Sequence, residues 1–206
     1  KYAVFEGDEY LTSPLDPRSK FHLYHPHVAI LTGIAWDHIN VFPTFPQYVD
    51  TFRQFVDLIE PNGHLIYYAG DENLDSIAKN ARKDIAVHPY EAIEADRPIG
   101  VFGKHNLQNM HAAQLACEQI GITFEQFMQA IQDFTGASNR LELIQKLDDR
   151  VAYKDFAHSP SKLRATINAV REEYPTMRLV AAMELHTFSS LMADFLPQYN
   201  GCMAEA

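Results

Sequence analysis

Short apolar runs alternate with helix-like segments along most of this chain, and this alternation limits its fold more than any other feature. Apolar residues recur at helical spacing over 44–59, 106–120, 123–134 and 161–174. Strand–helix alternation predicts an α/β fold with a mostly parallel sheet and helices on its faces. The strand-like runs are YAVF (2–5), HVAILT (27–32), HLIYYA (64–69), DIAVHPY (84–90), RVAYKDF (150–156) and MRLVAAME (177–184).

Small and polar residues mark where these segments begin and end. Thr44 with Gln47, and Thr123 with Gln126, have the spacing of a capping box at a helix start. The stretch TGASNR (135–140) follows two successive helices, and strand–helix–strand order is expected to restart after it at RLELIQ. We therefore predict two domains, 1–136 and 137–206.

Composition excludes several classes of partner. The chain carries 17 Lys and Arg against 27 Asp and Glu, a net charge of −10. Nucleic-acid binding requires basic groups that neutralise phosphates, so no nucleic-acid partner is expected. No apolar run approaches the roughly 18 residues of a membrane-spanning helix, so no membrane partner is expected. Cys117 and Cys202 form no CxxC pair, which favours a reducing, cytoplasmic compartment.

Both ends of the chain adjoin apolar sequence. The first residue is Lys1 rather than Met, the run YAVF begins at once, and the last residues follow an apolar, helix-like segment. We expect the chain to be part of a longer protein.

Polar clusters follow three of the strand-like runs. They are EGDE (6–9), Asp37-His38, and Asp155 with His158. In open parallel sheets, ligands bind beyond the carboxyl ends of strands. Carboxylates and imidazole, with coordination positions left to water and phosphate, suit Mg²⁺ or Mn²⁺. The alternative is that each cluster is an ordinary solvated loop.

The segment FGKHNLQNMHAA (102–113) holds two asparagines that are candidates for ligand binding. Asn106 stands where a helix should begin, so it is either an N-cap or a binding residue. Asn109, one turn further on, has no capping role, and its amide offers the donor and acceptors that the edge of an adenine ring requires. Lys104 does not lie in a P-loop, because the pattern GxxxxGK[ST] is absent from the chain.

His22, His25 and His27 suggest a structural zinc site as a further alternative. They straddle a proline and have no partnering Cys or HxxxH helix, so this hypothesis ranks last.

Five segments, in their order and spacing, resemble the ATP-dependent Mur ligase family, and the resemblance covers essentially the whole chain. It implies a partial central ATP-binding domain over 1–136, followed by part of a Rossmann-like carboxyl-terminal domain over 137–206. Members of this family activate a carboxylate as an acyl phosphate and join it to an amine in peptidoglycan synthesis. The segments are VFEGDEY, AILTGIAWDHINVFPT, GKHNLQNMHAA, FTGASNRLEL and YKDFAHSPSKLRATI.

The resemblance also implies roles for particular residues, with ATP and Mg²⁺ as cofactors. Glu6 and His38 match magnesium ligands, and His38 would lie beside the γ-phosphate of ATP. His38 and Arg140 are the expected catalytic residues, whereas Asp8 and Glu9 receive no role. The remaining expected contacts are Asn106 and Asn109 with adenine, Arg140 with the ATP phosphates, Asp155 with the ribose, and His158 with the incoming amine.

The implied substrates are UDP-N-acetylmuramate and a murein peptide. Residues 6–26 and 37–44 most resemble the branch that joins UDP-N-acetylmuramate to L-Ala-γ-D-Glu-meso-diaminopimelate. The first alternative is the branch that adds L-alanine, and the second is a non-catalytic nucleotide-binding module on the same scaffold. The segment TFRQF (51–55) lacks the lysine that several family members carbamoylate, as do both of these branches. Without a P-loop lysine for the β- and γ-phosphates, the chain alone is not expected to turn over ATP.

Overall fold

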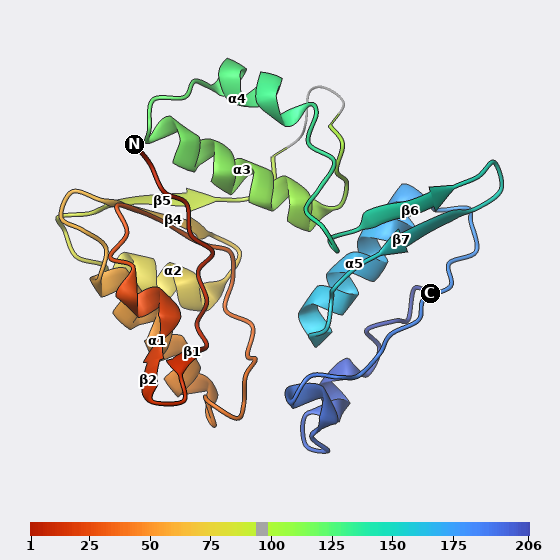
Figure 1. Cartoon of the computed structure of the whole chain (residues 1–206), viewed down its shortest axis with the longest axis horizontal. Coiled ribbons are helices and arrows are strands. Elements are labelled where there is room, and N and C mark those ends of the chain that lie inside the picture. Colours follow the sequence, from red (N-terminus) through yellow and green to blue (C-terminus); the bar gives the residue numbers. More distant parts are fainter. Residues whose placement is uncertain (94–98) are drawn as a thin grey trace. The chain divides into compact units, whose positions relative to one another are not determined.

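The computed structural model describes residues 1–93 and 99–206, and the contacts divide the chain into two compact units, Lys1–Glu91 and Ala92–Ala206 (Figure 1). The domain boundary predicted after residue 136 lies inside the second unit and stays a prediction. In the described part of the chain, no helix is long and apolar enough to cross a membrane.

A three-stranded parallel sheet forms the centre of the first unit. Its strand order is β3 (Val28–Leu31), β4 (His64–Tyr68) and β5 (Ala86–Tyr90). Ile30 lies opposite Ile66, and Ile66 lies opposite His88. These strands coincide with three of the predicted runs and confirm the α/β fold with a parallel sheet.

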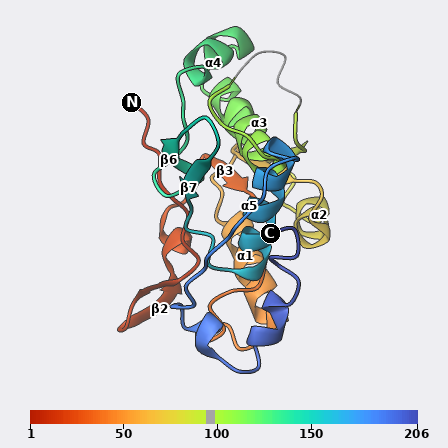
Figure 2. The ribbon, with the colours of Figure 1, turned by 90° about the vertical axis from the view of Figure 1, so that its right-hand side faces the viewer.

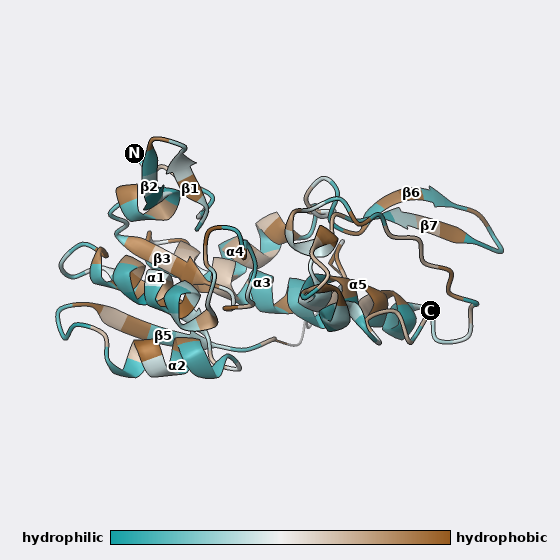
Figure 3. Cartoon of the chain, turned by 90° about the horizontal axis from the view of Figure 1, so that it is seen from below, coloured by the Kyte–Doolittle hydropathy of each residue, from teal (hydrophilic) through white to brown (hydrophobic). Residues whose placement is uncertain are grey.

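Two helices pack against one face of this sheet. The helix α1 (Phe45–Asp57) connects β3 to β4, and α2 (Glu72–Lys79) connects β4 to β5. Both are amphipathic, and Figure 3 shows hydrophilic and hydrophobic residues mixed along each of them. Burying apolar side chains of this size contributes roughly 1.5–3 kcal/mol each. The shared core includes Leu31 and Leu65 from the strands, Phe52 and Val56 from α1, and Leu74 and Ile77 from α2.

Gly63 lets the turn before β4 pass close to His27 and Ile59. A Cβ atom at this position would lie 2.7 Å from the carbonyl oxygen of His27 and 2.7 Å from Cγ2 of Ile59. Asn62, just before it, has a left-handed backbone with φ of 63°. The sequence Pro61-Asn62-Gly63 therefore lies in the turn between the end of α1 and the start of β4.

The start of the chain differs from the prediction. Residues 2–5 were predicted as a strand, yet Val4 is 97% exposed and none of the described strands includes them. An apolar run forms a strand only where a neighbouring edge supplies partners for its backbone, and none pairs with 2–5 here. An unpredicted antiparallel hairpin follows, made of β1 (Leu11–Ser13) and β2 (Asp16–Ser19), and then the short 3₁₀ helix η1 (Lys20–Leu23).

The second unit begins with two packed helices, α3 (Lys104–Glu118) and α4 (Phe124–Ile131). Met110 packs with Phe127 and Met128 in the core between them. The predicted capping box at the start of α4 is confirmed. The N-cap of α3 is Gly103, with φ of 90°, so Asn106 lies inside the first turn, and of its two alternative roles the N-cap does not hold.

The strands β6 (Glu142–Lys146) and β7 (Val151–Lys154) form an antiparallel hairpin, and they run side by side in Figures 1 and 2. The strand–helix–strand order predicted after residue 140 was therefore wrong. The connection over 147–150 is a tight turn closed by a 2.8 Å bond from the Leu147 N–H to the Arg150 carbonyl. A parallel pair needs a crossover of about a dozen residues or more, which this turn is too short to provide.

The helix α5 (Pro160–Glu173) packs against the end of the chain through Leu163, Ile167 and Cys202. Residues 177–184, predicted as a strand, are not one, although alternate residues do pack inward and Val180 is 75% exposed. Among the described residues no strand pairs with this segment. Two 3₁₀ turns, η2 (Ser189–Leu191) and η3 (Leu196–Tyr199), follow.

Candidate functional site

His38 lies in the loop that connects β3 to α1. Its backbone is left-handed, with φ of 53°, and its N–H donates a 2.7 Å hydrogen bond to Oδ1 of Asp37. Its carbonyl accepts hydrogen bonds from the N–H groups of Val41 and Phe42 at 2.8 and 2.9 Å. These bonds form a tight turn, and they leave the His38 side chain 34% exposed.

Asp71 anchors this loop to the start of α2. Its Oδ1 accepts hydrogen bonds from the N–H groups of Asn73 and Leu74 at 2.9 and 3.1 Å, which caps the helix. Its Oδ2 accepts a 2.6 Å bond from the N–H of Ile34, in the loop that carries His38. One carboxylate therefore serves both the helix and the loop.

The imidazole of His38 faces Glu9. Nε2 of His38 lies 3.6 Å from Oε1 of Glu9, and the edge of the His38 ring meets Tyr10 at 4.9 Å between ring centroids. The same Glu9 oxygen accepts a 2.8 Å hydrogen bond from the hydroxyl of Tyr48, in α1. Burial, and then the charge of Glu9, raise the pKa of Tyr48, so its hydroxyl remains a donor.

Asp8 and Lys20 hold the segment that carries Glu9. Oδ1 of Asp8 accepts a 2.8 Å bond from the N–H of Tyr10, and Oδ2 lies 2.6 Å from Nζ of Lys20. The N–H of Phe21 donates to the Asp8 carbonyl at 3.0 Å. Partial burial acts against ionisation, but the Lys20 ammonium and the Tyr10 N–H hold the pKa of Asp8 below its usual value. Glu9 is thus fixed between two residues that are tied to η1.

Glu6, the predicted magnesium ligand, lies apart from this arrangement. Its side chain is exposed, and within the described residues it makes no hydrogen bond or ion pair. The structure brings Glu9, rather than Glu6, beside His38.

The pair of His38 and Glu9 fits a magnesium site that has few protein ligands. Mg²⁺ usually keeps several waters and is held by one or two carboxylates together with substrate phosphates. Glu9 supplies a carboxylate, and the His38 nitrogen lies 3.6 Å from it. Among the described residues, no group of three or more His, Cys, Asp or Glu side chains is arranged to hold a metal ion. The remaining ligands would therefore be water and phosphate.

His22, His25 and His27, the histidines of the zinc hypothesis, form no such metal-binding group among the described residues either. Nε2 of His22 is instead hydrogen-bonded to the carbonyl of Thr51 at 2.9 Å, and His25 has a left-handed backbone with φ of 43°.

In the second unit, Asp155 connects three parts of the chain. Its Oδ2 accepts a 2.8 Å bond from the N–H of Leu141, a buried residue with φ of 46°. Its Oδ1 accepts bonds from the N–H of Ala157 at 2.7 Å and from the hydroxyl of Thr166, in α5, at 3.2 Å. A carboxylate offers about four lone-pair positions, so one remains for a ligand.

The start of α3 places the predicted asparagines. Nδ2 of Asn106 donates a 2.7 Å bond to the carbonyl of Phe102, which leaves the amide oxygen of Asn106 as an acceptor, and Asn109 is exposed one turn further on. The neighbouring His105 is partly buried. Burial lowers the pKa of His105, and the charge of Asp155 opposes this effect. Asp155 therefore lies near the start of α3.

Arg140 and His158 share one aromatic neighbour. The guanidinium carbon of Arg140 lies 5.5 Å from the centre of the Phe156 ring, and the His158 ring meets Phe156 at 4.9 Å. Nδ1 of His158 is 2.9 Å from the Phe156 carbonyl. The second unit thus brings Arg140, Asp155 and His158 close together through the residues next to β7.

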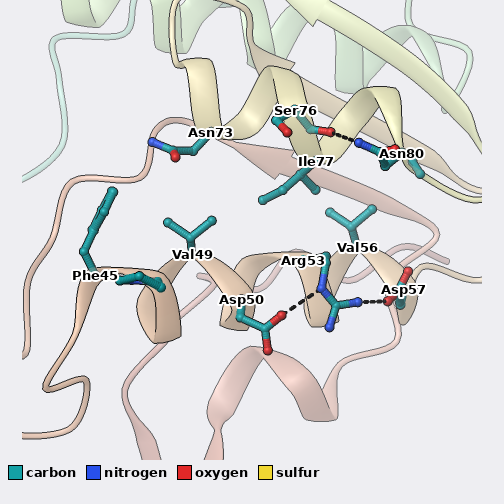
Figure 4. Close-up of a pocket in the computed structure, with 12 residues that line it drawn as sticks. Phe45, Val49, Asp50, Arg53, Val56, Asp57, Asn73, Ser76, Ile77 and Asn80 are labelled. Carbon is teal, nitrogen blue, oxygen red and sulfur yellow. Dashed lines mark hydrogen bonds and ion pairs between the residues drawn. The ribbon is translucent and has the colours of Figure 1, made fainter.

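A groove lies between α1 and α2, with a volume of about 540 Å³ (Figure 4). Val49, Val56 and Ile77 point into it, and Arg53 bridges Asp50 and Asp57 along α1 at 2.8 and 3.0 Å. None of the predicted site residues lines this groove.

Sequence reasoning missed the roles of Glu9 and Tyr48. Glu9 was noticed only as an acidic neighbour of Glu6, and Tyr48 only as part of the apolar stripe of a helix. The two are 39 positions apart, so no local pattern connects them.

Comparison with known families agrees with this fold. Residues 1–91, the whole of the first unit, match one family of domains. That family is the Mur ligase middle domain. His38, Glu9 and Tyr48 all lie within the matched residues.

Curated relatives match almost the whole chain. A UDP-N-acetylmuramate–L-alanine ligase of Streptococcus agalactiae serotype Ia is 29% identical over 227 residues, which cover 100% of this chain and 49% of the relative. The chain spans about half the length of the curated relatives it matches, with 50% coverage of the Streptococcus suis protein of the same name.

Solved Mur ligase structures have a similar fold. A murein peptide ligase from Psychrobacter arcticus superposes with a TM-score of 0.61 at 22% identity, over 90% of this chain and 45% of that one. A UDP-N-acetylmuramate–alanine ligase from Thermotoga maritima gives a TM-score of 0.57 at 16% identity, over 75% of this chain and 40% of that one. At these identities the likeness concerns the fold alone.

Proposed function

We propose that the intact protein is a cytoplasmic ATP-dependent ligase that joins the carboxylate of UDP-N-acetylmuramate to an amine in peptidoglycan synthesis. The match of residues 1–91 to the Mur ligase middle domain supports the reaction class. The observation that carries the site is His38 beside Glu9, with Tyr48 holding the carboxylate.

In the proposed reaction, the γ-phosphoryl group of ATP moves to an oxygen of the substrate carboxylate, and ADP is released. The nitrogen of the amine then attacks the acyl carbon, the bond between that carbon and the phosphate oxygen breaks, and inorganic phosphate and one proton of the amine are released. Bound Mg²⁺ would neutralise the negative charge that develops on the transferred group. His38 and Glu9 would hold the ion, and Tyr48 would keep Glu9 in position. Glu6 stays a proposed second carboxylate ligand.

Residues of the second unit are proposed to bind the nucleotide and the amine. Asn106 and Asn109 would meet the adenine through their amides, and Arg140 would contact the phosphates. Asp155 would accept a ribose hydroxyl at its remaining lone pair. His158, beside Phe156, would lie near the incoming amine.

The amine substrate is proposed to be the tripeptide L-Ala-γ-D-Glu-meso-diaminopimelate. Residues 6–26 support this choice through their resemblance to that branch of the family. L-Alanine is the second candidate, because the curated relatives are named as L-alanine ligases.

The test is phosphate release by the full-length protein with ATP, Mg²⁺, UDP-N-acetylmuramate and either amine. His38→Ala is expected to lower kcat by roughly 10²- to 10³-fold, the usual cost of losing a group that stabilises charge in the transition state. His25→Asn is the matched control, since it removes an exposed histidine at a backbone position that Asn tolerates. If neither amine supports phosphate release, the proposal is overturned.

A second measurement distinguishes the ligase hypothesis from the alternative that the protein is a non-catalytic nucleotide-binding module. Titration calorimetry of ATP with and without Mg²⁺ reports binding directly. Binding without phosphate release would favour the module, whereas turnover that requires His38 supports the ligase.

A further inference from the structure

Two histidines meet on neighbouring strands of the parallel sheet. His64 is the first residue of β4, and His88 lies opposite Ile66, two residues further along that strand. Side chains alternate along a strand, so His64 and Ile66 lie on one face, and His88 is their neighbour there. Nδ1 of His64 lies 3.0 Å from Nε2 of His88. The rings stack at 5.2 Å with an interplanar angle of 29°, and both residues are half-buried.

The two nitrogens are at hydrogen-bond distance, which is also close enough for both to bind one metal ion. With metal–nitrogen bonds of about 2.0–2.1 Å, two nitrogens 3.0 Å apart subtend an angle of about 94° at the metal. A tetrahedral ion such as Zn²⁺ needs about 109°, which corresponds to nitrogens about 3.3 Å apart at the same bond length. Square-planar and tetragonal ions such as Cu²⁺ and Ni²⁺ accept neighbouring ligands at about 90°.

We propose that His64 and His88 form a two-ligand binding site for a square-planar or tetragonal divalent transition metal, Cu²⁺ or Ni²⁺. Imidazole nitrogen is a preferred ligand of both ions. The hydrogen that the two facing nitrogens share would move to the other nitrogen of its own ring, so that both facing nitrogens offer a lone pair to the metal. Water completes the coordination sphere, because no third His, Cys, Asp or Glu of the described residues joins the pair in a metal-binding group.

This site is distinct from the one around His38. His64 begins β4 at the amino end of that strand, whereas His38 follows the carboxyl end of β3. Coordination would connect β4 to β5 and stabilise the folded state according to the metal concentration. The inference does not depend on the proposed ligase activity.

The experiment is calorimetric titration of the 206-residue chain with Cu²⁺, Ni²⁺ and Zn²⁺ separately at neutral pH. His64→Gln and His88→Gln are the test variants, and His25→Asn is the control for exposed histidines. We expect each test variant to weaken Cu²⁺ binding at least about tenfold. The Cu²⁺ affinity of the double variant should be no lower than that of either single variant. The control variant should bind Cu²⁺ as tightly as the unaltered chain. Far-UV circular dichroism checks that each variant is folded.

A measurement on the unaltered chain keeps the test independent of the variants. Nitrogen hyperfine structure in the electron paramagnetic resonance spectrum of the Cu²⁺ complex counts the coordinated imidazoles, and two are expected. One coordinated nitrogen, or a loss of affinity in only one of the two single variants, would overturn the pair as a site. Tighter binding of Zn²⁺ than of Cu²⁺ would overturn the geometric argument.

Discussion

The hydroxyl of Tyr48 donates a 2.8 Å hydrogen bond to Oε1 of Glu9, the same oxygen that lies 3.6 Å from Nε2 of His38. Tyr48 is buried in the core of the first unit, at 3% exposure. The packed interior of α1 therefore fixes a carboxylate at the edge of the proposed site. An interaction that contributes to stability and an interaction that orients the site share one oxygen atom.

Replacing Tyr48 with Phe should lower the free energy of unfolding by about 1.5–3 kcal/mol, the usual contribution of a hydrogen bond to a charged group. Urea unfolding followed by Trp36 fluorescence measures this, because Trp36 is the single tryptophan and lies in the first unit. Tyr10→Phe is the control, since within residues 1–93 and 99–206 its hydroxyl accepts a hydrogen bond only from the exposed amide of Asn40. If the free energy of unfolding falls equally in both variants, the Tyr48–Glu9 hydrogen bond does not make the expected contribution to stability.

Asp71 allows the two roles of its carboxylate to be separated. Asp71→Asn keeps an oxygen for the cap of α2 but cannot accept from the Ile34 N–H with its NH₂ group, so it should cost about 1–2 kcal/mol. Asp71→Ala also removes the cap and should cost about 1 kcal/mol more. Hydrogen exchange at the Ile34 amide should accelerate in both variants. Unchanged exchange in the Asn variant would show that the loop is held by other contacts.

The stability of the second unit should depend on pH through His105. Burial lowers the pKa of His105, so the unfolded chain binds a proton more readily than the folded one. The stabilisation is present above the unfolded pKa of about 6.5 and is lost as pH falls toward the folded pKa. Hydrogen exchange of amides in α3 between pH 5 and 8 measures the effect, and His105→Gln should flatten the dependence. An unchanged slope in this variant would place the titration elsewhere.

Asp155 should matter for folding as well as for nucleotide binding. Asp155→Ala removes acceptors from three donors and should lower the stability of the second unit by at least about 2 kcal/mol. Thr166→Val removes only the hydroxyl donor and should cost about 1 kcal/mol, which makes it the graded control. Amide exchange in β6 and β7 reports both changes. If the Asp155→Ala variant is as stable as the parent but binds ATP more weakly, Asp155 contributes to nucleotide binding and not to folding.

Much of the fold follows from local pattern. The strands β3, β4 and β5 and the helices α1, α3, α4 and α5 match segments that were predicted from the sequence. The hairpin of β1 and β2 was missed because its strands are short and polar, with sequences LTS and DPRS. Residues 2–5 and 177–184 show the opposite error. Their periodicity suits a strand, but strand formation also requires a neighbouring edge, which a pattern within one segment does not reveal.

The candidate site was predictable in its parts and not in its assembly. Asp37-His38 stands out as a polar pair after an apolar run, and Asp155 stands out after β7. The contact of Glu9 with His38 depends on Tyr48 in α1 and on Lys20, which binds Asp8. Such contacts are set by tertiary packing, so residue spacing alone gave Glu9 no role.

The left-handed backbone of His38 restricts which substitutions a lineage can accept at this position. At φ of 53°, Gly, Asn and Asp relieve or tolerate the conformation, but each of them removes the imidazole. Aromatic and β-branched residues preserve bulk and are strained there. Every substitution of His38 therefore either removes the imidazole or strains the backbone. As long as the imidazole is used, substitutions at this position should be accepted slowly during evolution.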